Sequence, residues 1–375
     1  MNFRIISISL IVPLLLSSCW KEEGDNIPVL PSRTILFYMA GDNSLGDETQ
    51  EKIDALADAW NISGDNHLLV YQDRGGEYMP RLLEIKSGAD GKGTTAVLEE
   101  YKEEDSASTG VFSRVLNDMI RFYPGSDYGL VMFSHSSGWL PAGTFAQPRS
   151  VVTDGDSEFS LIDFARVIPN GQFRFIVFES CLMAGVEVAY ELKDKVSYIL
   201  ASSAEILSPG FMPLYGKMLE RLYQVTPDLT GFARDYYDYC NLLSGDSRSA
   251  TVSVIHTAGL APLKSLLARA ESSVEHWEWV EREGIQHFDR RAKDYLFYDL
   301  EGYIKTIGTQ EEVNELAGIL EGSIVYQAAT EEFMMGDTYG FPIRQHCGLT
   351  IYIPVTKFKE LNSQRKRLLL FSEHQ

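Results

Sequence analysis

Short, continuously apolar runs rich in β-branched residues recur along the chain and predict buried strands. These runs cover residues 34–40, 67–72, 128–134, 173–178, 198–203, 250–256 and 349–353. Between them, apolar residues recur at helical spacing and predict amphipathic helices over residues 45–60, 108–122, 182–193, 213–223 and 229–241. Continuously apolar strands separated by helices favour a largely parallel sheet covered by helices on both faces, so we expect an α/β fold.

Two stretches interrupt this alternation. Residues 141–158 are polar and rich in glycine, proline and serine, so they predict a long exposed loop, and such loops are often functional or cleavable. Beyond residue 258 the strand signal fades and helical patterns dominate. We therefore expect an α/β core over residues 33–257 and a mostly helical C-terminal region over residues 258–375, which returns one strand (349–353) to the core.

The first residues have the pattern of an export signal. Arg4 precedes an apolar run that ends in LSSC at residues 16–19, which resembles a bacterial lipoprotein signal. We expect residues 1–18 to be removed, Cys19 to carry the lipid and residues 19–32 to form an exposed linker, with an ordinary secretory signal as the alternative. The acidic residues after Cys19 indicate an outer-membrane lipoprotein that faces the cell surface, or else a solvated linker.

The net charge of the chain indicates which partners it can bind. Its 375 residues include 53 acidic and 33 basic side chains, which gives a formal net charge of −20. Such a chain does not attract the phosphates of nucleic acids, whereas it suits cationic partners. Hydrophobic residues make up 45% of the sequence, so the acidity is not that of a disordered tail.

The cysteine count raises a question about reactivity. Four cysteines are too few for a scaffold built on disulfides. If Cys19 carries a lipid, Cys181, Cys240 and Cys347 remain, and three is an odd number. At least one thiol then stays unpaired outside the reducing cytosol.

Two of the predicted strands end in side chains that suit covalent catalysis. His135 follows the run 128–134, and Cys181 follows the run 173–178 and precedes a predicted helix. Ligands of α/β sheets bind beyond the carboxyl ends of the strands, where both residues would lie. A helix N-terminus favours the thiolate form of Cys181, and His135 could accept the thiol proton and later protonate a leaving amine.

A developing oxyanion at this place needs backbone N–H donors, and we expect the amides of Cys181, Ser136 and Gly138 to supply them. The two side chains also have structural alternatives. A lone cysteine after a buried strand is usually a small core residue, and a lone histidine at a strand end usually forms local hydrogen bonds.

Several segments resemble motifs of the clostripain family of cysteine peptidases. They are residues 38–45 (YMAGDNSL), 134–139 (SHSSGW), 179–192 (ESCLMAGVEVAYEL) and 199–205 (ILASSAE), and the likeness runs from about residue 32 to about residue 355. The resemblance implies a caspase-like three-layer α/β/α sandwich with His135 as the base and Cys181 as the nucleophile. It also implies a thiol protease, a hydrolase that cuts peptide bonds after arginine or lysine.

The resemblance further implies where specificity is set. In the family an aspartate two residues before the cysteine helps to form the P1 pocket, and the matching residue here is Glu179, which keeps the charge on a longer arm. A cationic P1 side chain needs such a carboxylate to offset its desolvation. Glu205 is a second candidate for the pocket, or else a surface or capping residue. Ser136 stands where glycine is common in the family, and it would be strained if its φ were positive.

Cleavage between the histidine and the cysteine often activates members of the family that the chain resembles. Arg149 precedes Ser150 in the predicted loop 141–158 and offers a site to an enzyme that prefers arginine. We expect self-cleavage after Arg149 to open the substrate cleft, with an ordinary surface arginine as the alternative.

Metal ligation has little support in the sequence. The histidines show no paired ligand spacing, so we expect no zinc site and no resident cofactor. Asp154, Asp156 and Glu158 lie close together without the full calcium-loop pattern, as the residues of a solvated acidic loop would. Calcium stays open because the family that the chain resembles includes calcium-dependent members.

These inferences converge on an exported, lipid-anchored cysteine endopeptidase that acts as a monomer on proteins or peptides with a basic P1 residue. A catalytically inactive caspase-like lipoprotein that binds peptides or glycans at the cell surface is the alternative. A surface lipoprotein whose acidic face binds cationic partners is a third. Peptide turnover that depends on Cys181 separates the enzyme from both.

Overall fold

A computed structural model describes residues 32–88, 91–125, 127–141, 151–290 and 294–372. The predicted signal (1–18), the lipidation residue Cys19 and the predicted self-cleavage residue Arg149 lie outside the described residues, as does the predicted linker apart from Ser32. The chain from Pro31 onward forms one compact unit, which holds all of the described helices and strands.

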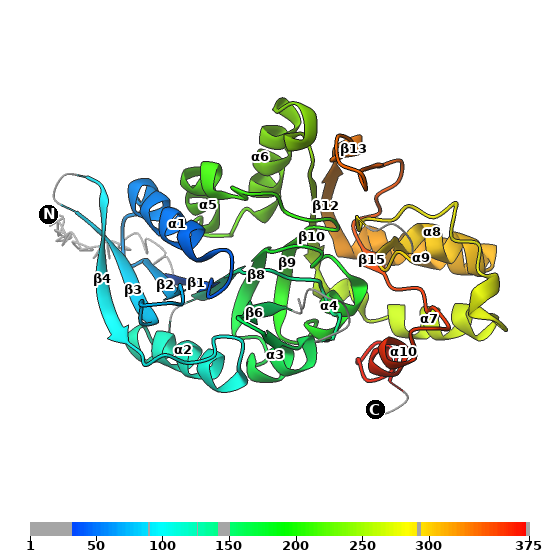
Figure 1. Cartoon of the computed structure of the whole chain (residues 1–375), viewed down its shortest axis with the longest axis horizontal. Coiled ribbons are helices and arrows are strands. Elements are labelled where there is room, and N and C mark those ends of the chain that lie inside the picture. Colours follow the sequence, from blue (N-terminus) through cyan, green and yellow to red (C-terminus); the bar gives the residue numbers. More distant parts are fainter. Residues whose placement is uncertain (1–31, 89–90, 126, 142–150, 291–293, 373–375) are drawn as a thin grey trace, which may run out of the picture. The chain divides into compact units, whose positions relative to one another are not determined.

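Within the described residues, nine strands form one central sheet (Figure 1). In chain order they are β1 (Arg33–Ala40), β2 (His67–Asp73), β3 (Arg81–Ser87), β4 (Gly93–Glu100), β5 (Asp127–Phe133), β8 (Phe173–Glu179), β9 (Val196–Ala201), β10 (Thr251–His256) and β12 (Ile324–Ala329). Their order across the sheet is β12-β10-β9-β8-β5-β1-β2-β3-β4. The inner strands from β9 to β2 are parallel, and the strands at both ends are antiparallel. The predicted mostly parallel sheet is confirmed.

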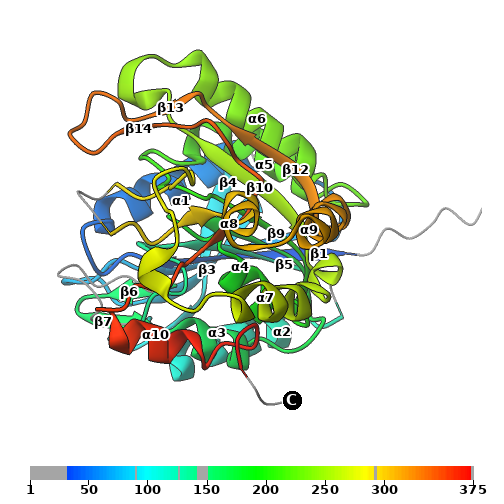
Figure 2. The ribbon, with the colours of Figure 1, turned by 90° about the vertical axis from the view of Figure 1, so that its right-hand side faces the viewer.

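Helices cover both faces of the sheet because successive side chains of each buried strand point to opposite sides. On β1, Ile35, Phe37 and Met39 face one core, and Leu36 and Tyr38 face the other. The first face is covered by α1 (Gly46–Ala59), α5 (Tyr215–Leu222) and α6 (Leu229–Leu242), and the second by α2 (Thr109–Phe122), α3 (Leu161–Val167) and α4 (Val186–Glu191) (Figure 2). This is the α/β/α sandwich that the resemblance implied.

Side-chain caps mark the beginning of two of the predicted helices, α2 and α6. The hydroxyl oxygen of Ser108 accepts the N–H of Val111 at the start of α2, and the carboxylate of Asp228 accepts the N–H of Gly231 at the start of α6. The bounds of α1 and α2 lie within one residue of the predicted ranges 45–60 and 108–122.

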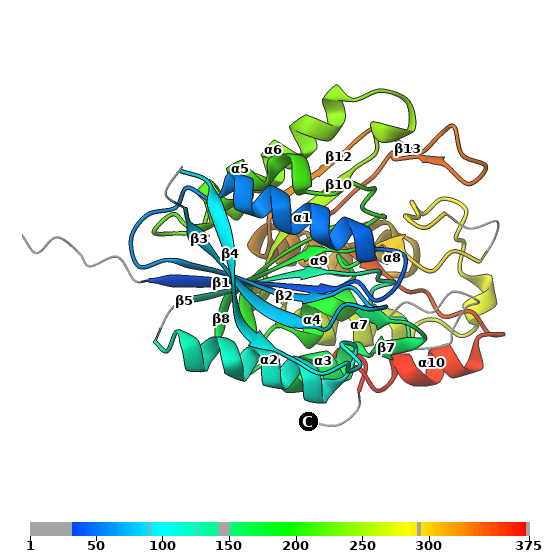
Figure 3. The ribbon, with the colours of Figure 1, turned by 60° about the vertical axis from the view of Figure 1, so that its left-hand side comes forward.

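The C-terminal region adds helices and short strand pairs (Figure 3). Its helices are α7 (Leu263–Ser272), α8 (Leu300–Ile307), α9 (Gln310–Ser323) and α10 (Lys359–Arg365). Outside the main sheet, β11 (Tyr298–Asp299) pairs with β15 (Thr350–Ile351), and β13 (Glu332–Phe333) pairs with β14 (Phe341–Pro342). In the described part of the chain, no helix has the length and apolar character needed to cross a membrane.

The strand expected at residues 349–353 does not join the main sheet. It is shortened to β15, which pairs with β11, and Thr350 forms an isolated bridge to Gly185. The edge beside β10 is occupied by β12, whose side chains are half-buried or exposed. An edge strand of this kind lacks the continuous apolar run by which the other strands were predicted.

The segment 141–158, expected to be a loop throughout, ends in a β-hairpin. The hairpin consists of β6 (Val152–Asp154) and β7 (Ser157–Phe159), and Val152 and Phe159 are buried in the core. Gly155 donates its N–H to the carbonyl oxygen of Asp42 at 2.6 Å. The hairpin is therefore tied to the loop that follows β1.

The strand order creates a crevice at one end of the sheet. The chain passes from β1 to β2 on one side of β1, and it later adds β5, β8 and β9 on the other side. In open α/β sheets, such a reversal leaves room for ligands beyond the carboxyl ends of the strands that flank it, here β1 and β5.

Candidate active site

The residues predicted to react leave neighbouring parallel strands in the same register. Phe133 of β5 pairs with Glu179 of β8, and His135 and Cys181 each follow two residues later. Parallel neighbours lie about 4.8 Å apart, so this register brings both residues to the same end of the crevice. Both side chains line one cavity of about 230 Å³.

Ser44 is a further residue at this place. It lies in the loop after β1, the other neighbour of β5, and its Oγ is 2.7 Å from Nε2 of His135. Asn43 anchors this loop, because its Nδ2 donates to the carbonyl oxygens of Ala40 at 3.3 Å and Thr153 at 3.1 Å. A hydroxyl group can accept a hydrogen bond from a protonated imidazole and donate one to a neutral imidazole, so Ser44 can hold the ring in either state.

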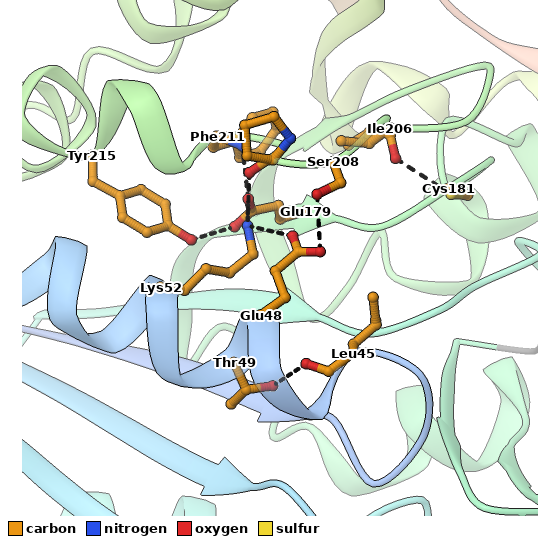
Figure 4. Close-up of polar contacts among 11 residues, drawn as sticks. Leu45, Glu48, Thr49, Lys52, Glu179, Cys181, Ile206, Ser208, Phe211 and Tyr215 are labelled. Carbon is orange, nitrogen blue, oxygen red and sulfur yellow. Dashed lines mark hydrogen bonds and ion pairs between the residues drawn. The ribbon is translucent and has the colours of Figure 1, made fainter.

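Cys181 is the most accessible of the cysteines that the structure describes. It is half-buried, with its Sγ 3.9 Å from the carbonyl oxygen of Ile206 (Figure 4), whereas Cys240 and Cys347 are buried. Burial raises the pKa of the Cys240 thiol to about 11, and it also raises the pKa of the Cys347 thiol. The two buried thiols are therefore poor nucleophiles, and Cys181 remains the candidate.

The prediction that a helix begins at Cys181 is wrong. Helix α4 begins only at Val186, and Gly185 precedes it without a side-chain cap. The chain instead turns at Leu182, whose φ of 63° costs roughly 1–2 kcal/mol in a residue with a side chain. Burial of Leu182 and its N–H bond of 3.0 Å to the carbonyl oxygen of Ala204 hold this turn. A thiolate at Cys181 would therefore depend on His135 rather than on a helix dipole.

The amides expected to bind an oxyanion differ in their contacts. Gly138 donates its N–H to Oγ of Ser136 at 3.2 Å, so this amide does not fit the expected role. The amides of Cys181 and Ser136 remain predicted donors.

Glycine is needed at position 138 for its backbone conformation, because its φ is +68° and a Cβ there would lie 2.8 Å from the carbonyl oxygen of Leu182. The φ of Ser136 is not positive, so serine is not strained where glycine was thought to be needed.

Glu179 does not present a free carboxylate to the cavity, contrary to the prediction for the P1 pocket. Its Oε1 lies 2.6 Å from Nζ of Lys52 and accepts the N–H of Phe211 at 2.7 Å. Its Oε2 accepts the hydroxyl group of Tyr215 at 2.8 Å (Figure 4). The side chain is only 1% exposed. Because the fold itself compensates this charge, Glu179 is a poor partner for a substrate cation.

Glu205, the second residue predicted for the pocket, lines the cavity and is also paired. Arg290 donates from Nε and Nη2 to Oε2 of Glu205, at 2.9 and 2.7 Å. The side chain of Glu205 is 25% exposed. Its charge is thus offset by an arginine that approaches from the C-terminal region.

Glu48 and Lys52 of α1 also line the cavity, and the sequence analysis missed both. Charged residues of an amphipathic helix are normally assigned to the solvent face. A signal was nevertheless present, because Lys52 lies within the helical stripe formed by Thr49, Ile53 and Leu56, all of which are buried. A lysine inside an apolar stripe needs a buried anion, which here is Glu179.

Carboxyl groups also gather beneath the loop that carries Ser44. Burial and the nearby charge of Asp154 raise the pKa of Asp73 to about 7. Asp154, one of the residues considered for calcium, lies in β6 and accepts the N–H of Ser106. Among the described residues, no group of three or more histidine, cysteine or acidic side chains is placed to hold a metal ion.

Comparisons with known proteins bear on this geometry. The model of the clostripain family matches residues 37–334 of the chain. The structure is similar to that of an inactive zymogen of a C11 protease from Parabacteroides distasonis, with a TM-score of 0.80 and 28% sequence identity over 92% of this chain and 98% of that chain. No curated protein sequence matches the chain.

A second structural neighbour is a secreted C11 cysteine protease from Bacteroides thetaiotaomicron in complex with an irreversible peptide inhibitor. The two structures align with a TM-score of 0.77 and 24% identity over 91% of this chain and 98% of that chain. At this identity the likeness concerns the fold alone.

Proposed function

The chain belongs to the clostripain family of cysteine peptidases, and on that premise we propose that it is an endopeptidase with Cys181 as nucleophile and His135 as general base. The observation that carries the proposal is that both residues line one cavity at the carboxyl ends of adjacent parallel strands. The half-buried thiol of Cys181 is the accessible one among the cysteines that the structure describes.

The proposed reaction follows from the chemistry of these two groups. His135 takes the thiol proton, and the thiolate of Cys181 attacks the carbonyl carbon of the scissile bond. Backbone N–H groups, with those of Cys181 and Ser136 as the candidates, stabilise the resulting oxyanion. The imidazolium then protonates the leaving amine, and the C–N bond breaks to give a thioester. Water hydrolyses the thioester with His135 again acting as the base.

Substrates with arginine or lysine at P1 suit the charge of this cavity. Its described lining includes three carboxylates, Glu48, Glu179 and Glu205, and one lysine, Lys52. Even with Glu179 paired to Lys52, an excess of negative charge remains beside the proposed nucleophile. That excess favours a cationic side chain over an apolar or acidic one.

The alternative proposal is an inactive, peptide-binding or glycan-binding member of the same fold. Two departures from the family motif supported it, at Ser136 and at Glu179. The ordinary φ of Ser136 removes the steric objection to activity at the first position. Burial of the Glu179 charge affects which substrate is bound but does not affect the bond cleavage by Cys181 and His135. We therefore favour an active peptidase over an inactive binding protein.

Activation and location are further parts of the proposal. Self-cleavage after Arg149 would act in the segment between the buried residues Leu140 and Val151, and the similar protein from Parabacteroides distasonis is described as an inactive zymogen. Lipid attachment at Cys19 would place the enzyme on the outer membrane. Metabolic labelling with a fatty acid tests the anchor, because a Cys19→Ser variant that still incorporates the label contradicts it.

One assay tests the proposed function. Residues 24–375 are incubated with fluorogenic peptides that end in Arg, Lys, Leu or Asp at P1. We expect turnover of the Arg or Lys peptides that is lost in Cys181→Ala and in His135→Ala and kept in the control Cys240→Ala. Failure of the wild type to cleave any peptide after a trypsin nick at Arg149, or retained activity in Cys181→Ala, contradicts the proposal.

A further inference from the structure

We infer that Lys52 is an internal counterion that removes Glu179 from substrate recognition and leaves Glu48 as the carboxylate that selects a basic P1 side chain. The inference rests on the proposed function, because it names which charge of the same cavity meets the substrate. It concerns the polar network drawn in Figure 4, which joins α1 to the end of β8 and to the segment around Phe211.

The ammonium group of Lys52 is held by groups of the protein itself. Nζ lies 2.6 Å from Oε1 of Glu179, 3.0 Å from the carbonyl oxygen of Pro209 and 3.3 Å from Oε1 of Glu48. The first two contacts are hydrogen bonds, and the third is an ion pair. The side chain is fully buried, and Nζ also lies 4.5 Å from the centre of the Phe133 ring. Lys52 is thus a fixed part of the cavity wall.

Glu179 is correspondingly unavailable to a second cation. Two of its three hydrogen bonds come from the segment that contains Phe211 and Tyr215. Gly210 permits this close approach, because its φ is +63° and a Cβ there would lie 2.5 Å from Oε1 of Glu179. A substrate ammonium or guanidinium group that reached Glu179 would come close to the buried charge of Lys52. Two positive charges close together repel each other strongly in a site without water.

Glu48 is placed differently on the same helix. It precedes Lys52 by one turn, and its Oε2 accepts the hydroxyl group of Ser208 at 3.1 Å. Its side chain is 18% exposed, against 1% for Glu179. Lys52 and Arg290 each pair with a carboxylate of the described cavity lining, Lys52 with Glu179 and Arg290 with Glu205, and Arg290 also lies 3.2 Å from Asp337 outside that lining. Of the two carboxylates that Lys52 contacts, Glu179 is nearer, at 2.6 Å against 3.3 Å for Glu48, so Glu48 is the less compensated of the two.

The test is the ratio of kcat/KM for a peptide with P1 Arg to that for the same peptide with P1 Leu. Lys52→Met/Glu179→Gln removes both buried charges together and keeps the lysine stem. The amide oxygen of Gln can accept the N–H of Phe211, and its NH2 group can donate to the hydroxyl oxygen of Tyr215. We expect this double variant to stay within about threefold of the wild-type ratio, because the charge it removes sums to zero. We expect Glu48→Gln to lower the ratio by about tenfold or more, and the exposed control Glu51→Gln on the same helix to leave it unchanged.

Opposite outcomes identify which proposal fails. A double variant that loses the preference for arginine, or a Glu48→Gln variant that keeps it, overturns the role of Lys52 and Glu48 while the peptidase stands. If the double variant does not fold, as judged by circular dichroism, Glu48→Gln decides alone. A wild type without Cys181-dependent turnover of any peptide contradicts the proposed function itself, and the inference fails with it.

Discussion

Oγ of Ser44 lies 2.7 Å from Nε2 of His135, so a residue that follows β1 orients the proposed base that follows β5. When the ring is protonated, as in a thiolate–imidazolium pair, Ser44 accepts the Nε2 hydrogen and stabilises the charge. Loss of the hydroxyl group should therefore make the imidazolium easier to deprotonate.

We expect Ser44→Ala to lower kcat/KM for a P1-Arg peptide by about tenfold. We also expect the alkaline limb of its pH–rate profile to move to lower pH, because an imidazolium without the hydrogen bond to Ser44 loses its proton at lower pH. Ser44→Thr keeps the hydroxyl group and should restore both properties. A Ser44→Ala enzyme with the wild-type profile would show that the contact does not position the base.

Processing after Arg149 gives a second prediction. Arg149 is the only basic residue between Pro141 and Asp154 in the sequence, and the hairpin that follows it is tied to the loop of Ser44. The purified wild type should divide into two fragments on a denaturing gel. Arg149→Ala and Cys181→Ala should remain whole, and the exposed control Arg166→Ala should divide normally.

Mass spectrometry of the fragments locates the cut. Division of Cys181→Ala at the same bond would mean that another protease makes it. Full activity of an undivided wild type would mean that processing is not needed for activation.

The pH dependence of folding gives a third prediction, which concerns Asp73. Burial, and after it the charge of Asp154, raises the pKa of Asp73 to about 7 in the folded protein, whereas an aspartate in the unfolded chain titrates near 4. Between these values the folded state holds more protons than the unfolded state. Stability therefore falls as pH rises from about 4 to about 7, and the loss is complete above that range.

Asp73→Asn removes this titration while it keeps an acceptor for the N–H of Gly75. At each pH we compare the unfolding free energy of the variant with that of the wild type. We expect this difference to favour the variant by about 2 kcal/mol more at pH 8 than at pH 4.5. Urea denaturation at the two pH values measures it, with the exposed Asp58→Asn as the control. Equal gains at both pH values would mean that Asp73 is not held protonated by the fold.

The sequence predicted the parallel centre of the sheet because those strands are apolar on both faces. The edge strands β12 and β4 were not predicted from the sequence. Their side chains are half-buried or exposed, so they do not form the apolar run on which the prediction relied. Helix α4 was predicted too long because the apolar residues between Cys181 and Val186 were assigned to a helix. They are instead buried in a turn that contains the positive φ of Leu182.

His135 and Cys181 could be proposed from the sequence because a reactive residue after a buried strand is a local signal. The roles of Ser44 and Lys52 depend on which strands and helices become neighbours. The helical stripe of α1 indicates that Lys52 is buried, but no local pattern identifies its partner. The pairing of Glu179 with Lys52 was missed for the same reason. The counterion of Glu179 lies 127 residues earlier in the chain, on α1.

The central claim is that Cys181 is the nucleophile of a peptidase, and covalent labelling tests it most directly. The wild type is incubated with a peptidyl chloromethyl ketone that ends in arginine, and the modified residue is identified by mass spectrometry. We predict one equivalent of label, on Cys181, with labelling strongly slowed in His135→Ala. Label on Cys240 or Cys347, or no label on an enzyme that cleaves peptides, would contradict the claim.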